Sequence, residues 1–394
     1  MKLSARLDLI KPSATMAVNE KATALRAQGV DLIDFGAGEP DFDTAQHIKD
    51  AAAAAMRAGK TKYTPVGGTD DLKAAIVAKL RRDNDLHYEK REVLASCGGK
   101  HSLFVAFQVL FGAGDEVIVP APFWVSYPDM LLLAGAQAQL VPTREENDFK
   151  MTPAELEAAI GPRTRAILLN SPSNPAGVAY TEQELAGLLD VVATREIIVI
   201  SDDVYELMVY GDFRLGRVLQ IRPDFRDRTL VVNSVSKTYA MTGWRVGYTA
   251  GPAHVIKAMS TLQGQMTSNP SSVAQAAAAE ALAGPQESVQ PMMREFGRRR
   301  DFVVERLRTI RGVRCPLPEG AFYVFPNVSA YLRKASGPTT GDDLAAYLIE
   351  TAHVAVVGGS DFGYPEHIRI SYATSMQNLE RGLDRIEDAL KKLD

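Results

Sequence analysis

Apolar and polar residues alternate in a regular rhythm through the middle of the chain. Short, mainly apolar stretches predict strands at 92–96, 115–120, 166–170, 196–201, 229–234 and 244–251. Between several of them, apolar residues recur at helical spacing, which predicts helices at 100–111, 181–193 and 254–266. This alternation of strand and helix is typical of a mostly parallel central sheet covered by helices, so we expect an α/β fold.

The pattern changes after about residue 290. The elements expected there are a charged helix, two short strands and a final helix, the first three at 293–310, 321–326 and 367–373. The final helix carries an apolar stripe that faces a core, formed by Leu379, Leu383, Ile386 and Leu390. The basic cluster Arg298–Arg300 is expected to be a solvated face of the charged helix.

The length of the chain favours two domains, because 394 residues exceed what one small core usually holds. We expect a large domain over 46–290 and a smaller α+β domain over 291–394. Residues 1–45 are expected to form an N-terminal arm and part of the small domain.

Composition and charge narrow the class of protein. Apolar residues make up 46% and charged residues 23%, as in ordinary soluble domains, and the net charge of -4 gives no sign of a nucleic-acid or membrane partner. The two cysteines, Cys97 and Cys315, form no disulfide framework, and the six histidines show no ligand spacing. We therefore expect a cytoplasmic protein without a metal, because no targeting segment or membrane span stands out.

Polar side chains follow the ends of several predicted strands. The residues concerned are Gly99 and Lys100, Trp124, Asn174, Asp202 and Tyr205, and Ser234, Ser236 and Lys237. Taken singly, each has a structural explanation: a Gly-Gly turn, a helix cap or a core tryptophan. Ligands of open α/β sheets bind beyond the carboxyl ends of the strands, however, so together these residues predict a site.

The predicted site has the groups that a pyridoxal 5′-phosphate site requires. A partly desolvated lysine near a cation has the lowered pKa needed to form an imine with an aldehyde. Two serine hydroxyls, an arginine and helix N–H groups can hold a phosphate dianion. A buried aspartate can pair with a protonated ring nitrogen, a tyrosine and an asparagine can bond a ring oxygen, and a tryptophan can stack on the ring.

A set of motifs extends this picture over essentially the whole chain. They are AGEPDFDT (37–44), KYTPVGG (62–68), SPSNPAG (171–177), SDDVYE (201–206), SVSKTYAMTGWRVG (234–247), GAFYVF (320–325) and IRISYATS (368–375). In their order and spacing the chain resembles the class I aminotransferases of the aspartate aminotransferase superfamily. The resemblance implies a pyridoxal-phosphate-dependent enzyme that acts on amino acids and 2-oxo acids.

The resemblance also implies roles for individual residues. Lys237 matches the imine-forming lysine, Asp202 the partner of the pyridine nitrogen, and Trp124 the aromatic residue stacked on the ring. Asn174 and Tyr205 match the groups that bond the phenolic oxygen of the cofactor. The phosphate ligands would be Gly99, the Lys100 backbone, Ser234, Ser236 and Arg245.

Two further residues match positions that bind substrate or bridge subunits in this family. Arg369 resembles the arginine that binds the substrate α-carboxylate, beside the backbone of Gly38. Tyr63 resembles the tyrosine that reaches across a dimer interface to the neighbouring phosphate. The resemblance therefore implies a homodimer with shared active sites.

Substrate preference depends on a position at which the chain departs from well-known members of the family. Well-known aspartate aminotransferases place an arginine for the distal carboxylate four residues before a Ser-Asn-Pro, where this chain has Gly264. In the bacterial subgroup that the chain most resembles, with KPSAT near the start and GGK before a helix, the lysine at Lys100 takes this role. Ser13 and Thr15 lie in the same subgroup motif and could donate to the same carboxylate. Transfer between aspartate and 2-oxoglutarate is therefore expected.

Several alternatives stay open at this stage. Lys100 could merely open a helix, in which case an aminotransferase for aromatic or apolar amino acids is the rival interpretation. Some members of the subgroup also use prephenate, whose ring carboxylate Lys11 could reach, although a solvated N-terminal lysine is an equally good interpretation. A transcription factor with an aminotransferase-like sensor domain is disfavoured, because the motifs begin within about the first 40 residues, too early for a DNA-binding module to precede them.

Overall fold

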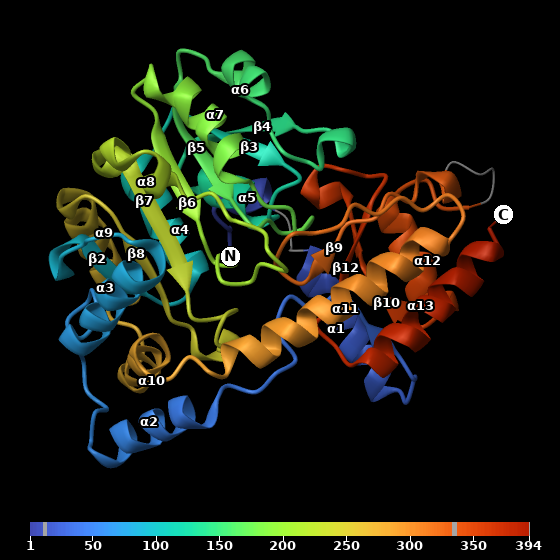
Figure 1. Cartoon of the computed structure of the whole chain (residues 1–394), viewed down its shortest axis with the longest axis horizontal. Helices are drawn as coiled ribbons and strands as arrows, with labels where there is room; N and C mark the ends of the chain where they lie inside the picture. The colour runs from blue at the N-terminus through green and yellow to red at the C-terminus, as the bar shows by residue number, and fades with distance from the viewer. Residues whose placement is uncertain (11–13, 333–336, 394) are drawn as a thin grey trace.

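The computed structural model describes residues 1–10, 14–332 and 337–393, and its centre is a seven-stranded sheet (Figure 1). In spatial order its strands are β2 (Val93–Ser96), β8 (Gly247–Ala250), β7 (Thr229–Ser234), β6 (Ile198–Asp202), β5 (Thr164–Asn170), β3 (Glu116–Ala121) and β4 (Gln137–Pro142). β8 runs antiparallel to both of its neighbours, and the pairs from β7 to β4 are parallel. The expected mostly parallel α/β sheet is confirmed.

Helices cover both faces of this sheet because its inner strands are apolar on both sides. Along β5, Ala166 and Leu168 enter one core cluster while Ile167 and Leu169 enter the other. The first cluster packs against α4 (Gly99–Leu110), α5 (Ser126–Leu133) and α9 (Ala253–Met266). The second packs against α2 (Gln46–Arg57), α3 (Asp70–Asn84), α6 (Pro153–Ala159), α7 (Glu182–Ala193), α8 (Val218–Ile221) and α10 (Ser272–Ala283).

The C-terminal part of the chain forms a smaller group of elements. Its strands are β9 (Tyr323–Val324), β10 (Val354–Ala355), β11 (Val357–Gly358) and β12 (Ile368–Ser371), and its helices are α11 (Val289–Thr309), α12 (Gly341–Thr351) and α13 (Met376–Lys391). The N-terminal elements α1 (Ala14–Ala27) and β1 (Ile33–Asp34) join this group, since β1 pairs with β10. In Figure 1, α11 runs from the side of the large sheet to this second group.

Three local differences from the sequence prediction have physical reasons. β4 was not predicted because its residues are mostly half-buried or exposed and lack a strong apolar run. The strand expected at 244–251 begins only at Gly247, because a short 3-10 turn ends at Trp244 and Arg245 has a left-handed φ of 55°. The solvated face expected at Arg298–Arg300 is wrong for Arg299, which is buried and donates to Asp41 Oδ1 at 2.7 Å.

Across the described parts of the chain, no helix combines the length and the apolar character needed to cross a bilayer.

Candidate active site

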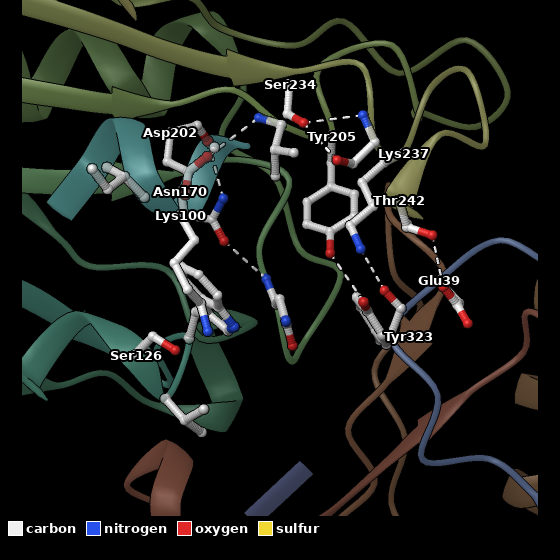
Figure 2. A pocket seen from close by; sticks show the side chains of 18 of the residues that line it. Glu39, Lys100, Ser126, Asn170, Asp202, Tyr205, Ser234, Lys237, Thr242 and Tyr323 are labelled. Atoms are coloured by element: carbon white, nitrogen blue, oxygen red, sulfur yellow. Dashed lines mark hydrogen bonds between the residues drawn. The ribbon is translucent and has the colours of Figure 1, made fainter. Parts of the chain in front are cut away.

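A cavity of about 400 Å³ opens at the carboxyl ends of the parallel strands (Figure 2). The strands deliver polar residues to it because parallel strands end at one edge: β5 ends at Asn170, β6 at Asp202 and β7 at Ser234. The sequence-predicted residues that line it are Gly38, Gly99, Lys100, Trp124, Asn174, Asp202, Tyr205, Ser234, Ser236, Lys237, Arg245 and Arg369. Residues separated by up to 331 positions, from Gly38 to Arg369, thus share one cavity.

Lys237 projects into this cavity from the turn that follows β7. Its Nζ donates a hydrogen bond to the carbonyl oxygen of Gly38. Burial lowers the pKa of Lys237 to about 8, with the cations Arg369 and Arg245 acting in the same direction and Glu39 opposing them. About a tenth of an amine with that pKa is neutral at pH 7, compared with well under ~0.1% of an ordinary lysine. The amine is therefore suited to nucleophilic attack on a carbonyl.

The end of the cavity near α4 is built to receive an anion. Ser234 Oγ and Ser236 Oγ lie 2.7 Å apart, and α4 begins at Gly99 with its N–H groups at the same cavity. Arg245 approaches closely because Gly98 has no side chain: a Cβ at Gly98 would lie 2.5 Å from Arg245 Nη2. Two hydroxyls, a guanidinium and a helix N-terminus are the donors that a phosphate dianion requires.

A buried carboxyl group, that of Asp202, also lines the cavity. The residue is only 5% exposed, and its Oδ2 accepts a hydrogen bond from the Tyr127 hydroxyl at 2.6 Å. Burial raises the pKa of Asp202 to about 6, although the Tyr127 hydrogen bond and the charge of Lys237 act against the shift. A cationic partner such as a protonated ring nitrogen would stabilise the ionised form.

Tyr127 was missed from the sequence. In the sequence, Tyr127 is only a tyrosine three residues after Trp124, at the start of α5. Nothing in that pattern distinguishes a tyrosine that binds Asp202 from one that packs in the core.

Arg369 is held on β12 by two hydrogen bonds, which use two of the five N–H donors of its guanidinium. Its Nη1 donates to Asn174 Oδ1 at 3.1 Å and its Nη2 to the carbonyl oxygen of Gly36 at 2.7 Å. Its Nε is buried and has no partner among the described residues. A buried guanidinium that lines a cavity and has unused N–H donors fits a carboxylate ligand, which would supply acceptors and a negative charge.

Tyr205 meets a second tyrosine that the sequence analysis did not single out. The hydroxyls of Tyr205 and Tyr323 lie 3.0 Å apart, and Figure 2 shows both beside Lys237. The guanidinium carbon of Arg369 lies 4.7 Å from the centroid of the Tyr323 ring. Tyr323 belongs to the GAFYVF motif, yet an aromatic residue in a strand is usually core, so the motif alone did not reveal this contact.

Lys100 lies beside Trp124 at one wall of the cavity. Its Nζ is 4.9 Å from the centroid of the Trp124 ring, within the range of a cation–π contact. Burial and the neighbouring Arg245 lower the pKa of Lys100. Lys100 is an exposed residue that lines the cavity, so a carboxylate bound there would gain an accessible cation.

The remaining predicted residues are placed differently. Tyr63 does not line the cavity of its own chain and is 93% exposed. Ser13 lies outside the described residues, and Thr15 falls in α1 with its side chain outside the described set. Gly264 lies in α9, where a Cβ would contact only Val66, at 3.6 Å.

Known proteins resemble this chain over almost its full length. The family Aminotransferase class I and II matches residues 30–386. The aspartate/prephenate aminotransferase of Cereibacter sphaeroides is 51% identical over 390 residues, and the aspartate aminotransferase of Geobacillus stearothermophilus is 48% identical over 386, each match covering 98% of both chains. The structure of the Thermus thermophilus aspartate aminotransferase with maleate superposes with a TM-score of 0.93 at 41% identity, covering 99% of this chain and 100% of that one. The chain belongs to the class I and II aminotransferases.

Proposed function

We propose that this aminotransferase uses pyridoxal 5′-phosphate to transfer the amino group of L-aspartate to 2-oxoglutarate, which yields oxaloacetate and L-glutamate. The observation that carries the proposal is the presence of two separate cations, Arg369 and Lys100, at the cavity that contains Lys237. An amino acid with two carboxylates needs one cation for each. The relatives named aspartate aminotransferase, and the Thermus thermophilus structure with the diacid maleate, support this substrate class.

The donor set of the cavity fits the proposed cofactor. Ser234, Ser236, Arg245 and the N-terminus of α4 would hold its phosphate, and Asp202 would face its ring nitrogen. When bound, pyridoxal phosphate supplies an electron sink for the carbanion that forms at the substrate Cα. The buried Asp202 carboxylate would keep the ring nitrogen protonated, while Tyr127 holds that carboxylate in place.

The chain's own groups would orient the substrate and move its proton. Arg369 would bind the α-carboxylate through its guanidinium, with Asn174 holding that group in position. Lys237 Nζ, with a pKa of about 8, is a base of suitable strength to remove the proton from the substrate Cα and return it to the product.

Replacement of Lys100 tests the proposed recognition of the second carboxylate. In Lys100→Ala we expect kcat/KM for aspartate and glutamate to fall roughly ten- to a hundredfold, because a charge-assisted contact of about 1.5–3 kcal/mol is lost. Alanine and phenylalanine have no distal carboxylate, so their kcat/KM should be unchanged or improved. The measurement is steady-state kinetics with this panel of amino donors.

The control for Lys100 is Arg369→Ala, which should weaken every amino acid because all carry an α-carboxylate. Lys100 also contributes a backbone N–H to the predicted phosphate site, so general damage to cofactor binding is a trivial alternative. Such damage would lower all substrates equally. Equal losses for aspartate and phenylalanine in Lys100→Ala would contradict the specificity role.

We also propose that the active unit is a homodimer in which Tyr63 serves the neighbouring site. Its 93% exposure in the single chain is unusual for an aromatic side chain and leaves its hydroxyl available to a second copy. If Tyr63→Ala is inactive, mixing it with inactive Lys237→Ala subunits should restore part of the activity, because one hybrid site has both groups. No recovery after verified subunit exchange would place the whole site within one chain.

Prephenate is a second candidate amino acceptor. The relative from Cereibacter sphaeroides, at 51% identity, is named aspartate/prephenate aminotransferase. Prephenate carries a second carboxylate, for which the chain offers Lys100 at the cavity. Lys11, which could also take part, lies outside the described residues. Assays of oxaloacetate and prephenate side by side, with glutamate as donor, would decide whether the enzyme uses both.

A further inference from the structure

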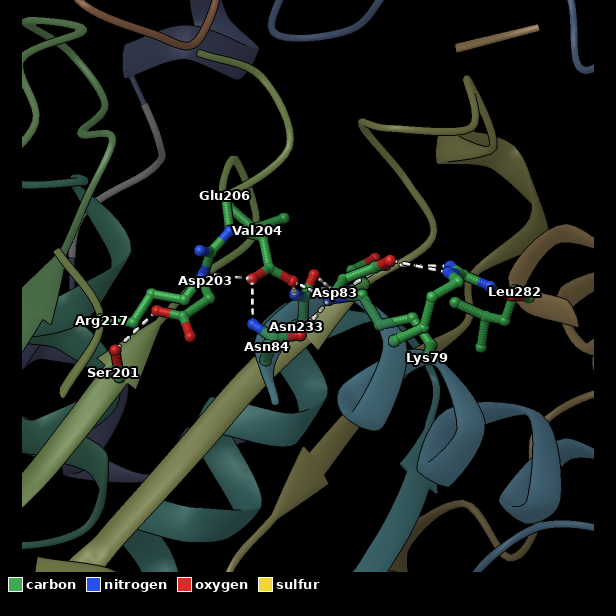
Figure 3. Close-up of polar contacts among 12 residues, drawn as sticks. Lys79, Asp83, Asn84, Ser201, Asp203, Val204, Glu206, Arg217, Asn233 and Leu282 are labelled. Atoms are coloured by element: carbon green, nitrogen blue, oxygen red, sulfur yellow. Dashed lines mark hydrogen bonds and ion pairs between the residues drawn. The ribbon is translucent and has the colours of Figure 1, made fainter. Parts of the chain in front are cut away.

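A buried ionic network joins α3 to the turn that follows β6 (Figure 3). At its centre is Glu206, which is 3% exposed. Its carboxylate accepts hydrogen bonds from Lys79 Nζ and Asn84 Nδ2, and Lys79 is itself only 2% exposed. Arg217 Nε contacts the same carboxylate at 3.4 Å. None of these four side chains lines the cavity.

The network reaches the predicted phosphate site through one residue. Asn233 Nδ2 donates to Glu206 Oε1 at 2.6 Å, and Asn233 Oδ1 accepts the backbone N–H of Ser234 at 2.7 Å. Glu206 also directly follows Tyr205 in the chain. The carboxylate of Glu206 is therefore joined by covalent bonds to the turn that carries Tyr205 and by hydrogen bonds to the end of β7 that carries Ser234.

Only an ionised carboxylate satisfies all the groups around Glu206. Lys79, Asn84, Asn233 and Arg217 all present donors, and the two oxygens of a carboxylate can accept from each of them. Burial alone would raise the pKa of Glu206, but the charges of Lys79 and Arg217 outweigh it and the pKa is lowered.

The neighbouring Asp203 differs from Glu206 in its pKa and in its hydrogen-bond partners. Burial, followed by the charge of Glu206, raises the pKa of Asp203 to about 7, so Glu206 is the more strongly ionised of the two. Asp203 accepts from Ser201 Oγ at 2.6 Å and has no hydrogen bond to Asn233 among those described. The two carboxyl groups of one turn thus differ in whether they connect to Ser234.

We propose that Glu206 is a positioning residue that, through Asn233, holds Ser234 where it can bind the phosphate of the cofactor. The inference rests on the proposed function and extends it to a side chain that touches neither cofactor nor substrate. A purely structural role is the alternative, in which the network only fastens α3 to the sheet. The positioning role predicts that disrupting the network weakens binding of the cofactor's phosphate selectively. A purely structural role predicts no such selectivity for the phosphate.

The test compares pyridoxal 5′-phosphate with pyridoxal, which has the same ring and aldehyde but no phosphate. Both are titrated into cofactor-free protein and followed by absorbance. In Glu206→Gln, the amide NH₂ group would be a donor placed against other donors, which should disturb the network. Affinity for pyridoxal phosphate should then fall about tenfold or more, while affinity for pyridoxal should stay within about twofold of wild type. Asp203→Asn is the matched control, a carboxylate-to-amide change in the same turn, and should leave both affinities unchanged.

Two further variants protect the test against unfolding, because Glu206→Gln removes the nearer of two carboxylates from the buried Lys79, whose Nζ lies 3.9 Å from Asp83 Oδ2. Lys79→Met/Glu206→Gln removes both charges, and Asn233→Ala cuts the link to Ser234 while the Lys79–Glu206 pair remains. Both should show the same phosphate-selective loss, with folding checked by circular dichroism.

The outcomes separate this inference from the proposed function. An unchanged affinity for pyridoxal phosphate in the folded variants, or equal losses for pyridoxal phosphate and pyridoxal, would overturn the positioning role. If the wild-type protein itself bound no pyridoxal phosphate, the proposed function would fail first, and the wild-type titration alone would reveal it.

Discussion

Lys237→Ala is expected to abolish both covalent attachment of pyridoxal phosphate and transamination. Two lysines of the described chain line this cavity, Lys237 and Lys100. Burial lowers the pKa of Lys237 to about 8 and its Nζ bonds the Gly38 carbonyl, whereas Lys100 Nζ lies 4.9 Å from the centroid of the Trp124 ring. The purified wild-type protein should be yellow, and borohydride reduction should fix the cofactor to the peptide containing residue 237. Mass spectrometry of the reduced protein measures this directly.

Lys100→Ala provides the control for that experiment, since it removes another lysine from the same cavity. The cofactor should still be fixed to Lys237 in that variant. Retention of a reducible lysine adduct and normal turnover in Lys237→Ala would show that another residue holds the cofactor. Arginine cannot replace the lysine, because a guanidinium stays protonated and forms no such bond.

The low pKa of Lys237 also predicts how attachment depends on pH. Raising the pH through about 8 deprotonates the amine, so the rate at which cofactor-free protein captures the aldehyde should rise and then level off above that value. An unperturbed lysine would instead show a rate that keeps rising to about pH 10.

Much of the fold could be predicted because hydrophobic pattern and burial agree in the inner strands. β5, β6 and β7 are apolar runs that end in Asn170, Asp202 and Ser234, so both their direction and the site at their ends follow from the sequence. β4 escaped prediction because an edge strand packs on fewer neighbours and needs no strong apolar run.

Contacts between residues that lie far apart in the sequence could not be predicted. Tyr127 contacts Asp202 across 75 positions and Tyr323 contacts Tyr205 across 118, and no local pattern encodes such a pair. Arg299 was expected in solvent, but it reaches Asp41 across 258 positions and is buried against it. The partner of a charged residue on a helix can be identified only when the position of the contacting loop, here the one that carries Asp41, is known.

Asp202→Asn is expected to keep the cofactor but to lose catalytic rate on the order of 10²–10³-fold, the loss typical of removing one well-placed electrostatic contact in an active site. Attachment should persist because Lys237, Ser234 and Ser236 are unchanged. The rate should fall because a neutral amide cannot keep the ring nitrogen protonated, and the carbanion at the substrate Cα is then poorly stabilised. Single-turnover kinetics with aspartate measure this step without product release.

Tyr127→Phe is the matched control for the charge of Asp202. It removes the 2.6 Å hydrogen bond to the carboxylate but leaves the negative charge beside the ring nitrogen. Without that donor the pKa of Asp202 should rise further above about 6, since the Tyr127 hydrogen bond now lowers it. We therefore expect Tyr127→Phe to lose activity mainly at acidic pH, where the carboxyl group becomes protonated, and Asp202→Asn to lose it at every pH. Wild-type single-turnover rates in Asp202→Asn, or equal pH-independent losses in both variants, would contradict the assignment of Asp202 as the charged partner of the cofactor.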